Sequence, residues 1–577
     1  MDAAAAATRQ YPPEIVERIV SFIPDPKTRF RAAVALRLLH IRDACIPLLK
    51  DYTNLDTASR CGQLDLLHWW ASSGLKLPYS EAAVDEASAA GRIEVLEWWK
   101  ARGKKLKYTE RAIDLACENG HTDVLSWWLA SGLKLRYSKK AIDSASANGD
   151  IDMLDTWRLS GKHLNYTCQA MDGASKNRHI NTLRWWLASG LDIDYSASAV
   201  ASACENGDMT ILSFWRDCGL EFKYSEGAMD LASKGGHTAI LEWWHASGLE
   251  LRYSELALWY ASEQGHISVL EWWRNSGLEL RYCCGALTQA CEQGHINILE
   301  WWHNSGLEMR YNVAALNKAS GRGHVDVLEW WRSSGLELRY TASTLNSASA
   351  EGQISTLEWW RSSGLELRYS ETALDLASEE GHISILEWWL RSGLEMHYSE
   401  RVMDGASWGG HINALSWWRN SGLELRYSTK SLDKASAEGH ISVLDWWLGS
   451  GLELKWTISA INEASGWGRV TVLQWWKDSG LKLEYDEKAM DEASRQGRIE
   501  VLSWWLKSGL ELRYSNEALE QATLYGHIRV LKWWAESGLE MRLGDDILGW
   551  TKPLSAARRW WVKSGLLAKD VVSALIE

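Results

Sequence analysis

Several residue types and motifs are scarce in this chain of 577 residues. Phenylalanine occurs 4 times and proline 7 times. No run of 18 apolar residues is present, so we expect no membrane-spanning segment. The N-terminus lacks the basic region of a secretory signal. The nine cysteines form no C-x-x-C pair, which indicates a reducing compartment, the cytoplasm or the nucleus.

Positive charge is also in short supply. The chain carries a net charge of −13. Phosphate binding requires clustered cations, so the sequence predicts that nucleic acid is not a partner. We interpret the one cationic cluster as a solvated face rather than a phosphate site. That cluster consists of Lys104, Lys105, Lys107, Lys134, Arg136, Lys139 and Lys140.

Catalytic motifs are missing as well. We find no phosphate-binding loop, no nucleophile elbow and no H-E-x-x-H. One column of histidines and one of aspartates recur at fixed spacing, but catalytic sites place different residues in different roles. Neighbouring repeats lie about 10 Å apart, too far for adjacent histidines to share a metal ion. We therefore expect no enzyme, cofactor or metal site. The histidines are His121, His179, His237, His266, His295, His324, His382, His411, His440 and His527, and the aspartates are Asp85, Asp114, Asp143, Asp375, Asp404 and Asp433.

Tryptophan, in contrast, is abundant, with 39 residues. Tryptophan pairs recur every 29 residues over seventeen copies, from Trp69-Trp70 to Trp533-Trp534, without insertion or deletion. Two pairs are incomplete, at Thr156-Trp157 and Phe214-Trp215, and an eighteenth pair follows at Trp560-Trp561. A fixed period of this length is the signature of a solenoid. We expect at least one tryptophan of each pair to lie in the core, and the other to be partly exposed on the convex side.

The repeat 369–397 predicts two short helices. Ser370 is a good N-cap for a first helix over 371–380, and Gly381 ends that helix. A second helix over 382–391 carries a wide apolar stripe and ends near Gly393. We assign the aspartates to the helix dipole and the histidines to the start of the second helix. Small residues on the first helix and tryptophans on the second predict a curved, all-α solenoid with short extended connectors. The first helices would line its concave side along an arc on the order of 150 Å.

The repeat resembles the ankyrin repeat over residues 52–543. Gly265-His266, Leu270, Trp272-Trp273 and Gly277 stand where ankyrin repeats have Gly-His, an aliphatic run and a helix-ending glycine. The period is shorter than the ankyrin period of about 33 residues, which implies shortened hairpin fingers. A leucine-rich repeat with a strand in each copy is the alternative, but it has no place for the Gly-His or the helix caps.

The N-terminal segment is similar to the opening of an F-box. The match rests on Pro12, Pro13, Glu14, Ile15, Ile19, Phe22 and Ile23. It implies that residues 11–50 dock a Skp-type adaptor of a cullin ubiquitin ligase, although no tryptophan follows between Arg31 and Leu49. The alternative is a capping segment, which any solenoid needs. The predicted domains are 1–51 (F-box-like or cap), 52–543 (repeats) and 544–577 (C-terminal cap).

Partner-binding residues are best sought where the repeat pattern is broken. Large aromatic residues break it at Trp259, Tyr260, Trp408, Trp467 and Tyr525. Exposed aromatic residues are typical binding anchors, so we predict a contact patch of Trp408, Trp467 and Tyr525, with local repacking as the alternative. The function we expect is a monomeric scaffold that holds a protein partner on its concave face and serves as the substrate-recognition subunit of a ubiquitin ligase. The alternative is an elastic spacer without a dedicated ligand.

Overall fold

The computed structural model describes residues 55–72, 79–102, 106–543 and 556–566. These residues form 35 helices and no strand. The chain divides at Cys283 and Cys284 into two compact units. The prediction of an all-helical repeat solenoid is confirmed, while the leucine-rich alternative is wrong for the described repeats because their connectors contain no strand. The predicted domain boundaries at 51 and 544 fall outside the described residues.

Each repeat contributes a first helix with an odd label and a second helix with an even label. In the first unit the helices are α5 (Leu55–Arg60), α6 (Leu64–Ser72), α7 (Ala82–Ala89), α8 (Ile93–Ala101), α9 (Arg111–Glu118), α10 (Thr122–Ala130), α11 (Lys140–Ala147), α12 (Ile151–Leu159), α13 (Gln169–Lys176), α14 (Ile180–Ser189), α15 (Ala197–Glu205), α16 (Met209–Asp217), α17 (Gly227–Lys234), α18 (Thr238–Ala246), α19 (Leu256–Glu263) and α20 (Ile267–Asn275).

The second unit continues the same alternation, and α39 carries the last tryptophan pair. Its helices are α21 (Cys284–Gln293), α22 (Ile296–Asn304), α23 (Val313–Arg322), α24 (Val325–Ser333), α25 (Ser343–Ala350), α26 (Ile354–Ser362), α27 (Thr372–Glu379), α28 (Ile383–Ser392), α29 (Arg401–Trp408), α30 (Ile412–Asn420), α31 (Lys430–Glu438), α32 (Ile441–Gly449), α33 (Ser459–Gly466), α34 (Val470–Asp478), α35 (Lys488–Arg495), α36 (Ile499–Ser508), α37 (Glu517–Leu524), α38 (Ile528–Glu536) and α39 (Ala556–Ser564).

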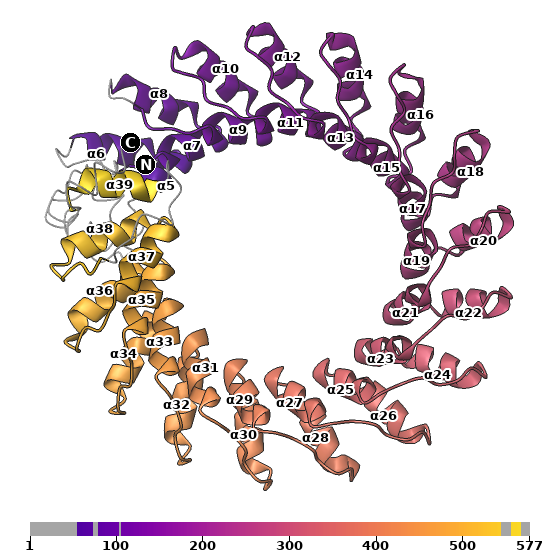
Figure 1. Cartoon of the computed structure of the whole chain (residues 1–577), viewed down its shortest axis with the longest axis vertical. Helices are drawn as coiled ribbons and strands as arrows, with labels where there is room; N and C mark the ends of the chain where they lie inside the picture. Colours follow the sequence, from indigo (N-terminus) through magenta and orange to yellow (C-terminus); the bar gives the residue numbers. More distant parts are fainter. Residues whose placement is uncertain (1–54, 73–78, 103–105, 544–555, 567–577) are drawn as a thin grey trace, which may run out of the picture. The chain divides into compact units, whose positions relative to one another are not determined.

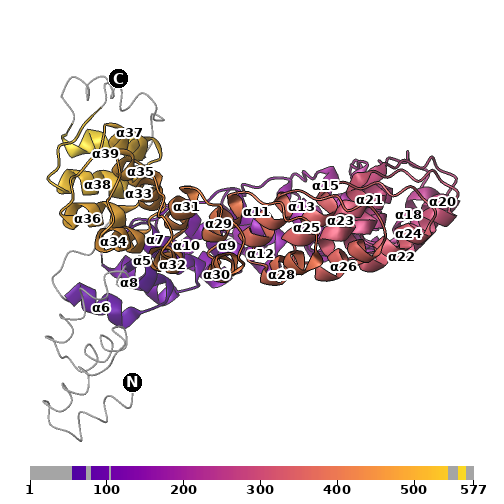
Figure 2. The same ribbon diagram turned by 90° about the horizontal axis from the view of Figure 1, so that it is seen from below.

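Within each unit the first helices stack on one another in an inner row, and the second helices fan out behind them (Figure 1). The view from below shows the helix pairs of each unit following one another side by side (Figure 2). Small side chains permit this close stacking, because Ala373 and Ala377 are buried within the first helices. The predicted placement of small residues on the inner row is therefore confirmed for each unit.

A left-handed residue separates the two helices of each repeat. Gly381 has a φ of +74°, and a Cβ atom there would lie 2.6 Å from Nδ1 of His411 in the next repeat. Glycine is needed at this position for both reasons. Arg178 replaces it once, with a φ of 63°, and is the only described residue other than glycine with a positive φ.

The two tryptophans of a pair have different surroundings. Every described second tryptophan is at most 4% exposed, and its indole packs between repeats. Trp389, for example, donates from Nε1 to Oγ of Ser349 at 3.0 Å, 40 residues earlier. The first tryptophan of each described pair is buried to half-buried, and Trp388 donates to Glu358 of the preceding repeat at 2.7 Å. The prediction that at least one tryptophan of each pair belongs to the core is confirmed for the described pairs.

Cysteines replace the indole-bound serine in three repeats. Trp244 donates to Sγ of Cys204 at 3.4 Å, and Trp331 donates to Sγ of Cys291 at 3.2 Å. Burial raises the pKa of Cys204 and of Cys291 to about 12, so these thiols remain protonated at neutral pH. Cys117, at the same repeat position, is buried as well. The interpretation of these three cysteines as small core residues is confirmed.

Candidate interaction surface

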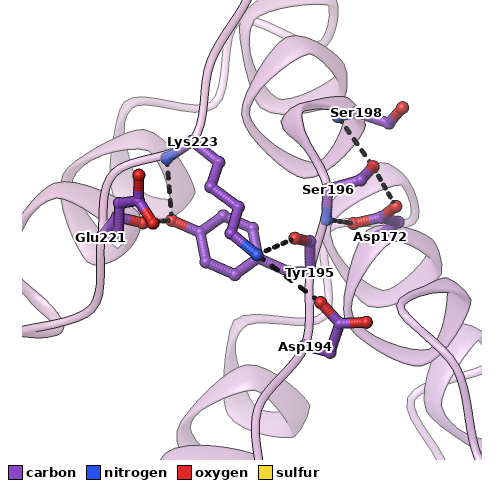
Figure 3. A network of polar contacts seen from close by, with 7 residues as sticks. All are labelled: Asp172, Asp194, Tyr195, Ser196, Ser198, Glu221 and Lys223. Carbon is purple, nitrogen blue, oxygen red and sulfur yellow. Dashed lines mark hydrogen bonds and ion pairs between the residues drawn. The ribbon is translucent and has the colours of Figure 1, made fainter.

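A buried polar clamp joins many of the described first helices to the next one. Asp172 accepts a hydrogen bond from the backbone N of Ser196 at 2.9 Å and another from its Oγ at 2.5 Å (Figure 3). The Ser196 Oγ in turn accepts from the backbone N of Ser198 at 3.1 Å, as an N-cap does. The aspartate column therefore fixes the start of the following helix, and our assignment of it to the helix dipole alone was wrong.

The same clamp recurs through both units. Burial raises the pKa of Asp375 above its ordinary value, although the hydrogen bonds from Ser399 oppose this shift. Asn346 replaces the aspartate in the preceding repeat, and its Oδ1 accepts from the backbone N of Ser370 at 3.1 Å. Further clamps join Asp56 to Ser80, Asp85 to Thr109, Asp114 to Ser138, Asp143 to Thr167, Asp230 to Ser254, Asp404 to Ser428, Asp433 to Thr457 and Asp491 to Ser515.

A second set of contacts is built on the tyrosine that opens most repeats. Tyr195 stacks on Trp215 with ring centroids 4.0 Å apart, and its hydroxyl donates to the carbonyl of Glu221 (Figure 3). Lys223 lies 5.2 Å from the Tyr195 ring centre and donates from Nζ to the Tyr195 carbonyl at 3.0 Å. The connector residue Lys223 is thus engaged by the tyrosine that opens its own repeat.

Most of the cationic cluster in the first unit has the same structural role or is exposed. Lys107 lies over the ring of Tyr79 at 5.0 Å, and Arg136 lies over that of Tyr108 at 5.3 Å. Lys134, Lys139 and Lys140 are exposed, whereas Lys104 and Lys105 lie outside the described residues.

The histidine column closes the C-terminal ends of first helices. Nε2 of His266 lies 3.0 Å from the carbonyl oxygen of Lys234, and Nε2 of His324 lies 2.9 Å from that of Glu292. Arg469 replaces the histidine in one repeat and donates from Nε to the carbonyl of Ala437 at 3.0 Å. Among the described residues no group of His, Cys, Asp or Glu could hold a metal ion. No described helix is long and apolar enough to cross a membrane.

The two residues before each turn glycine form what we call the turn row, for example Glu379 and Glu380. In the first unit this row is rich in asparagine. Asn206 donates from Nδ2 to the carbonyl of Lys176 at 2.7 Å. The residue after the turn glycine of that repeat is Asp208, which accepts hydrogen bonds at the start of α16 and has no proton to donate when ionised. Asparagine therefore supplies the cap that histidine or arginine supplies elsewhere. Asn148 does the same in the repeat of Asp150, and Asn119 and Asn177 donate to the equivalent carbonyls in repeats that carry His121 and His179.

In the second unit the turn row carries aromatic residues instead. Trp408, Trp467 and Tyr525 are 45%, 54% and 57% exposed. They stand at the C-terminal ends of α29, α33 and α37, in every second repeat. We call these three residues the aromatic ridge. Stacked helices lie about 8–10 Å apart, so consecutive rings are separated by roughly 20 Å.

The other predicted binding residues do not join this ridge. Trp259 and Tyr260 lie in α19 of the first unit and are half-buried, with ring centroids 4.9 Å apart. Lys234 covers Tyr260 at 5.6 Å. Trp259 occupies the position of a clamp aspartate, and Cys283 occupies that of its serine partner, so both halves of one clamp are replaced together. Whether Trp259 and Tyr260 bind a partner stays a prediction, with local repacking as the alternative.

No family model matches the sequence, and no curated protein matches it. One solved structure that matches is the pentatricopeptide repeat protein PPR10 from maize, at 14% identity over 98% of each chain, with a TM-score of 0.28. Another is PPR10 in complex with an 18-nucleotide psaJ RNA element, at 12% identity over 100% of this chain and 96% of that one, with a TM-score of 0.32.

These comparisons correct three sequence-based predictions. The matching structures are pentatricopeptide repeat proteins, so the identification with ankyrin repeats is wrong. The prediction that nucleic acid is not a partner is contradicted, because two of the matching structures are complexes with RNA. The F-box identification has no support from any family model, and its residues lie outside those described: Pro12, Pro13, Glu14, Ile15, Ile19, Phe22 and Ile23.

Proposed function

We propose that this helical-repeat protein is a binding scaffold, and that the aromatic ridge is where it holds an extended polypeptide. One observation carries the proposal. Trp467 and Tyr525 occupy the turn position of the hydrogen-bonding asparagines of the first unit, Trp408 stands one residue earlier in its turn, and all three rings are exposed. Exposed aromatic side chains are typical anchors of binding interfaces.

The fold itself does not require these rings. In the repeat of Trp467, the preceding carbonyl cap comes from Arg469. In the following repeat, Arg498 donates from Nε to the carbonyl of Gly466 at 3.4 Å. Since the cap is supplied from the other side of the turn glycine, the position of Trp467 is free to serve another purpose.

The spacing and the surrounding charge favour a polypeptide. An extended chain advances about 3.3 Å per residue, so roughly six residues connect one ring to the next. Exposed carboxylates of Glu351, Glu380 and Glu438 share the turn row with the rings. They would repel a phosphate backbone along the same path. RNA binding is accordingly the competing outcome that the experiment must detect.

Selection from a random peptide display library tests the proposal. The full chain and a triple variant, Trp408→Ala/Trp467→Ala/Tyr525→Ala, serve as baits. The control variant Leu390→Ala/Leu448→Ala/Leu506→Ala removes exposed leucines from second helices instead. A pool of labelled single-stranded RNA is titrated in parallel.

We expect peptides that bind the wild type and the leucine variant but not the ridge variant. Peptides that bind all three baits equally would overturn the role of the ridge. RNA binding that depends on the ridge, without peptide binding, would overturn the choice of polypeptide. If none of the baits binds either ligand, the spacer alternative is favoured.

A further inference from the structure

We propose, on the basis of the proposed function, that the ligand of the aromatic ridge is a basic segment. Its lysine or arginine side chains would stack on the exposed rings, at intervals of about six residues set by the extended-chain rise. The glutamates of the turn row would flank these cations.

The orientation of the helix backbones gives the turn row of the second unit a negative electrostatic potential. The turn row stands at the C-terminal ends of parallel, stacked first helices, among them α25, α27, α29 and α31. Each helix C-terminus carries a partial negative charge from its terminal carbonyls. A cation near these ends is stabilised, and an anion is disfavoured.

Side-chain carboxylates add to this potential. Glu351 and Glu380 are the exposed C-cap residues of α25 and α27, and Glu438 is the exposed last residue of α31. They fall on both sides of Trp408 along the chain of repeats. Carboxylates beside an open aromatic face are the combination that recognises a cation best.

Trp408 is held in a position suited to this role. Its indole Nε1 donates to Oε1 of Glu438 at 3.3 Å, which ties one edge of the ring. Gly409 follows it, where a Cβ atom would lie 2.3 Å from the carbonyl oxygen of Glu379, so this turn packs tightly on the previous repeat. The ring is oriented by these contacts and still 45% exposed.

The three rings should differ in their affinity for a cation, because cations of the protein already have partners beside them. Arg469 is 3.7 Å from Oε2 of Glu438, the carboxylate that also accepts from Trp408. Arg495 pairs with Glu492 at 2.6 Å, and Tyr525 contributes to raising its pKa. Arg401, in the helix of Trp408, is engaged by Glu379 at 2.9 Å. We therefore expect Tyr525 to contribute least to cation binding.

Defined peptides test this inference by fluorescence anisotropy. One labelled Gly/Ser peptide carries three arginines six residues apart, a second carries the same three arginines in succession, and a third carries three glutamates six residues apart. We expect the spaced arginine peptide to bind most tightly. Trp408→Ala should weaken it about 5- to 30-fold, the range of one to two kcal/mol for a desolvated cation–π contact.

Conservative variants distinguish the loss of a peptide contact from the loss of folded protein. Trp408→Phe should keep most of the affinity, whereas Glu380→Gln and Glu438→Gln should weaken binding and flatten its dependence on salt. Equal affinity for the spaced and successive peptides would overturn the inference. Ridge-dependent peptides from the display selection that are neutral or acidic would also overturn it, while the proposed function would stand. If no peptide binds in a way that depends on the aromatic ridge, both this inference and the proposed function are wrong.

Discussion

The turn rows of the two units lie at equivalent positions in the repeat but differ in their contacts. In the first unit Asn206 ties its turn to the carbonyl of the preceding helix. In the second unit Trp467 makes no such bond, because Arg469 supplies the cap. A repeat position therefore becomes available for binding once a neighbouring residue takes over its structural task. A residue that breaks the repeat pattern is therefore a binding candidate only where another residue makes the structural hydrogen bond of that position.

The sharpest way to test this difference compares a buried tryptophan with an exposed one. Trp389→Ala should lower the free energy of unfolding by about 3–5 kcal/mol, because it removes a large buried ring and the hydrogen bond to Ser349. Trp408→Ala should change it by less than about 0.5 kcal/mol. Guanidinium titration followed by circular dichroism measures both. A large loss of stability in the second variant would show that the ridge is structural.

The clamp predicts an intermediate effect that is common to both units. Asp375→Ala removes the acceptors of the Ser399 backbone N and Oγ, which should cost about 1–3 kcal/mol. Asp375→Asn is the matched control, because Asn346 fills the same position in the preceding repeat. Hydrogen exchange at the start of α29 reports the change locally. Equal protection in both variants would mean that the clamp contributes nothing.

The asparagine turn row should be structural and the aromatic ridge should not. Asn206→Ala should destabilise the protein by about 1 kcal/mol, since the carbonyl of Lys176 loses its donor. Trp467→Ala should leave the unfolding midpoint in place while weakening peptide binding. The two variants are measured side by side for stability and for affinity. The comparison fails if Asn206→Ala weakens peptide binding as strongly as Trp467→Ala does.

The smallest expected effect is a dependence of stability on pH. Burial raises the folded-state pKa of Asp375, so the folded protein binds more protons than the unfolded chain between the ordinary and the raised pKa. Stability from this group is thus gained as pH falls through that window and is lost as pH rises. Glu371 adds to the raised pKa, while Ser399 and Arg401 oppose it. Asp375→Asn should flatten the slope of unfolding free energy against pH, and an unchanged slope would contradict this cause.

Much of the fold follows from local pattern. The helix pairs, the turn glycines and the burial of one tryptophan per described pair agree with expectations drawn from helix periodicity and capping. Trp408, Trp467 and Tyr525 were singled out because each breaks the repeat locally, and their role as a binding patch stays a prediction. These features depend on residues within one or two turns of each other, so the linear sequence contains the necessary information.

Contacts between repeats could not be derived in the same way. The clamp joins residues 24 positions apart, and the indole–serine bond joins residues 40 apart. The sequence does contain one sign of the clamp. Trp259 replaces the aspartate of one repeat, and 24 residues later Cys283 replaces the serine that would be its partner. The cap that Arg469 supplies in the repeat of Trp467 was equally hidden, because it joins residues 32 positions apart.

The most direct test of the account is a titration of the spaced arginine peptide against the wild type and the triple variant Trp408→Ala/Trp467→Ala/Tyr525→Ala. The account predicts saturable binding to the wild type and a loss of more than about 30-fold in the variant, whose unfolding midpoint stays unchanged. Equal affinity for both proteins would contradict it.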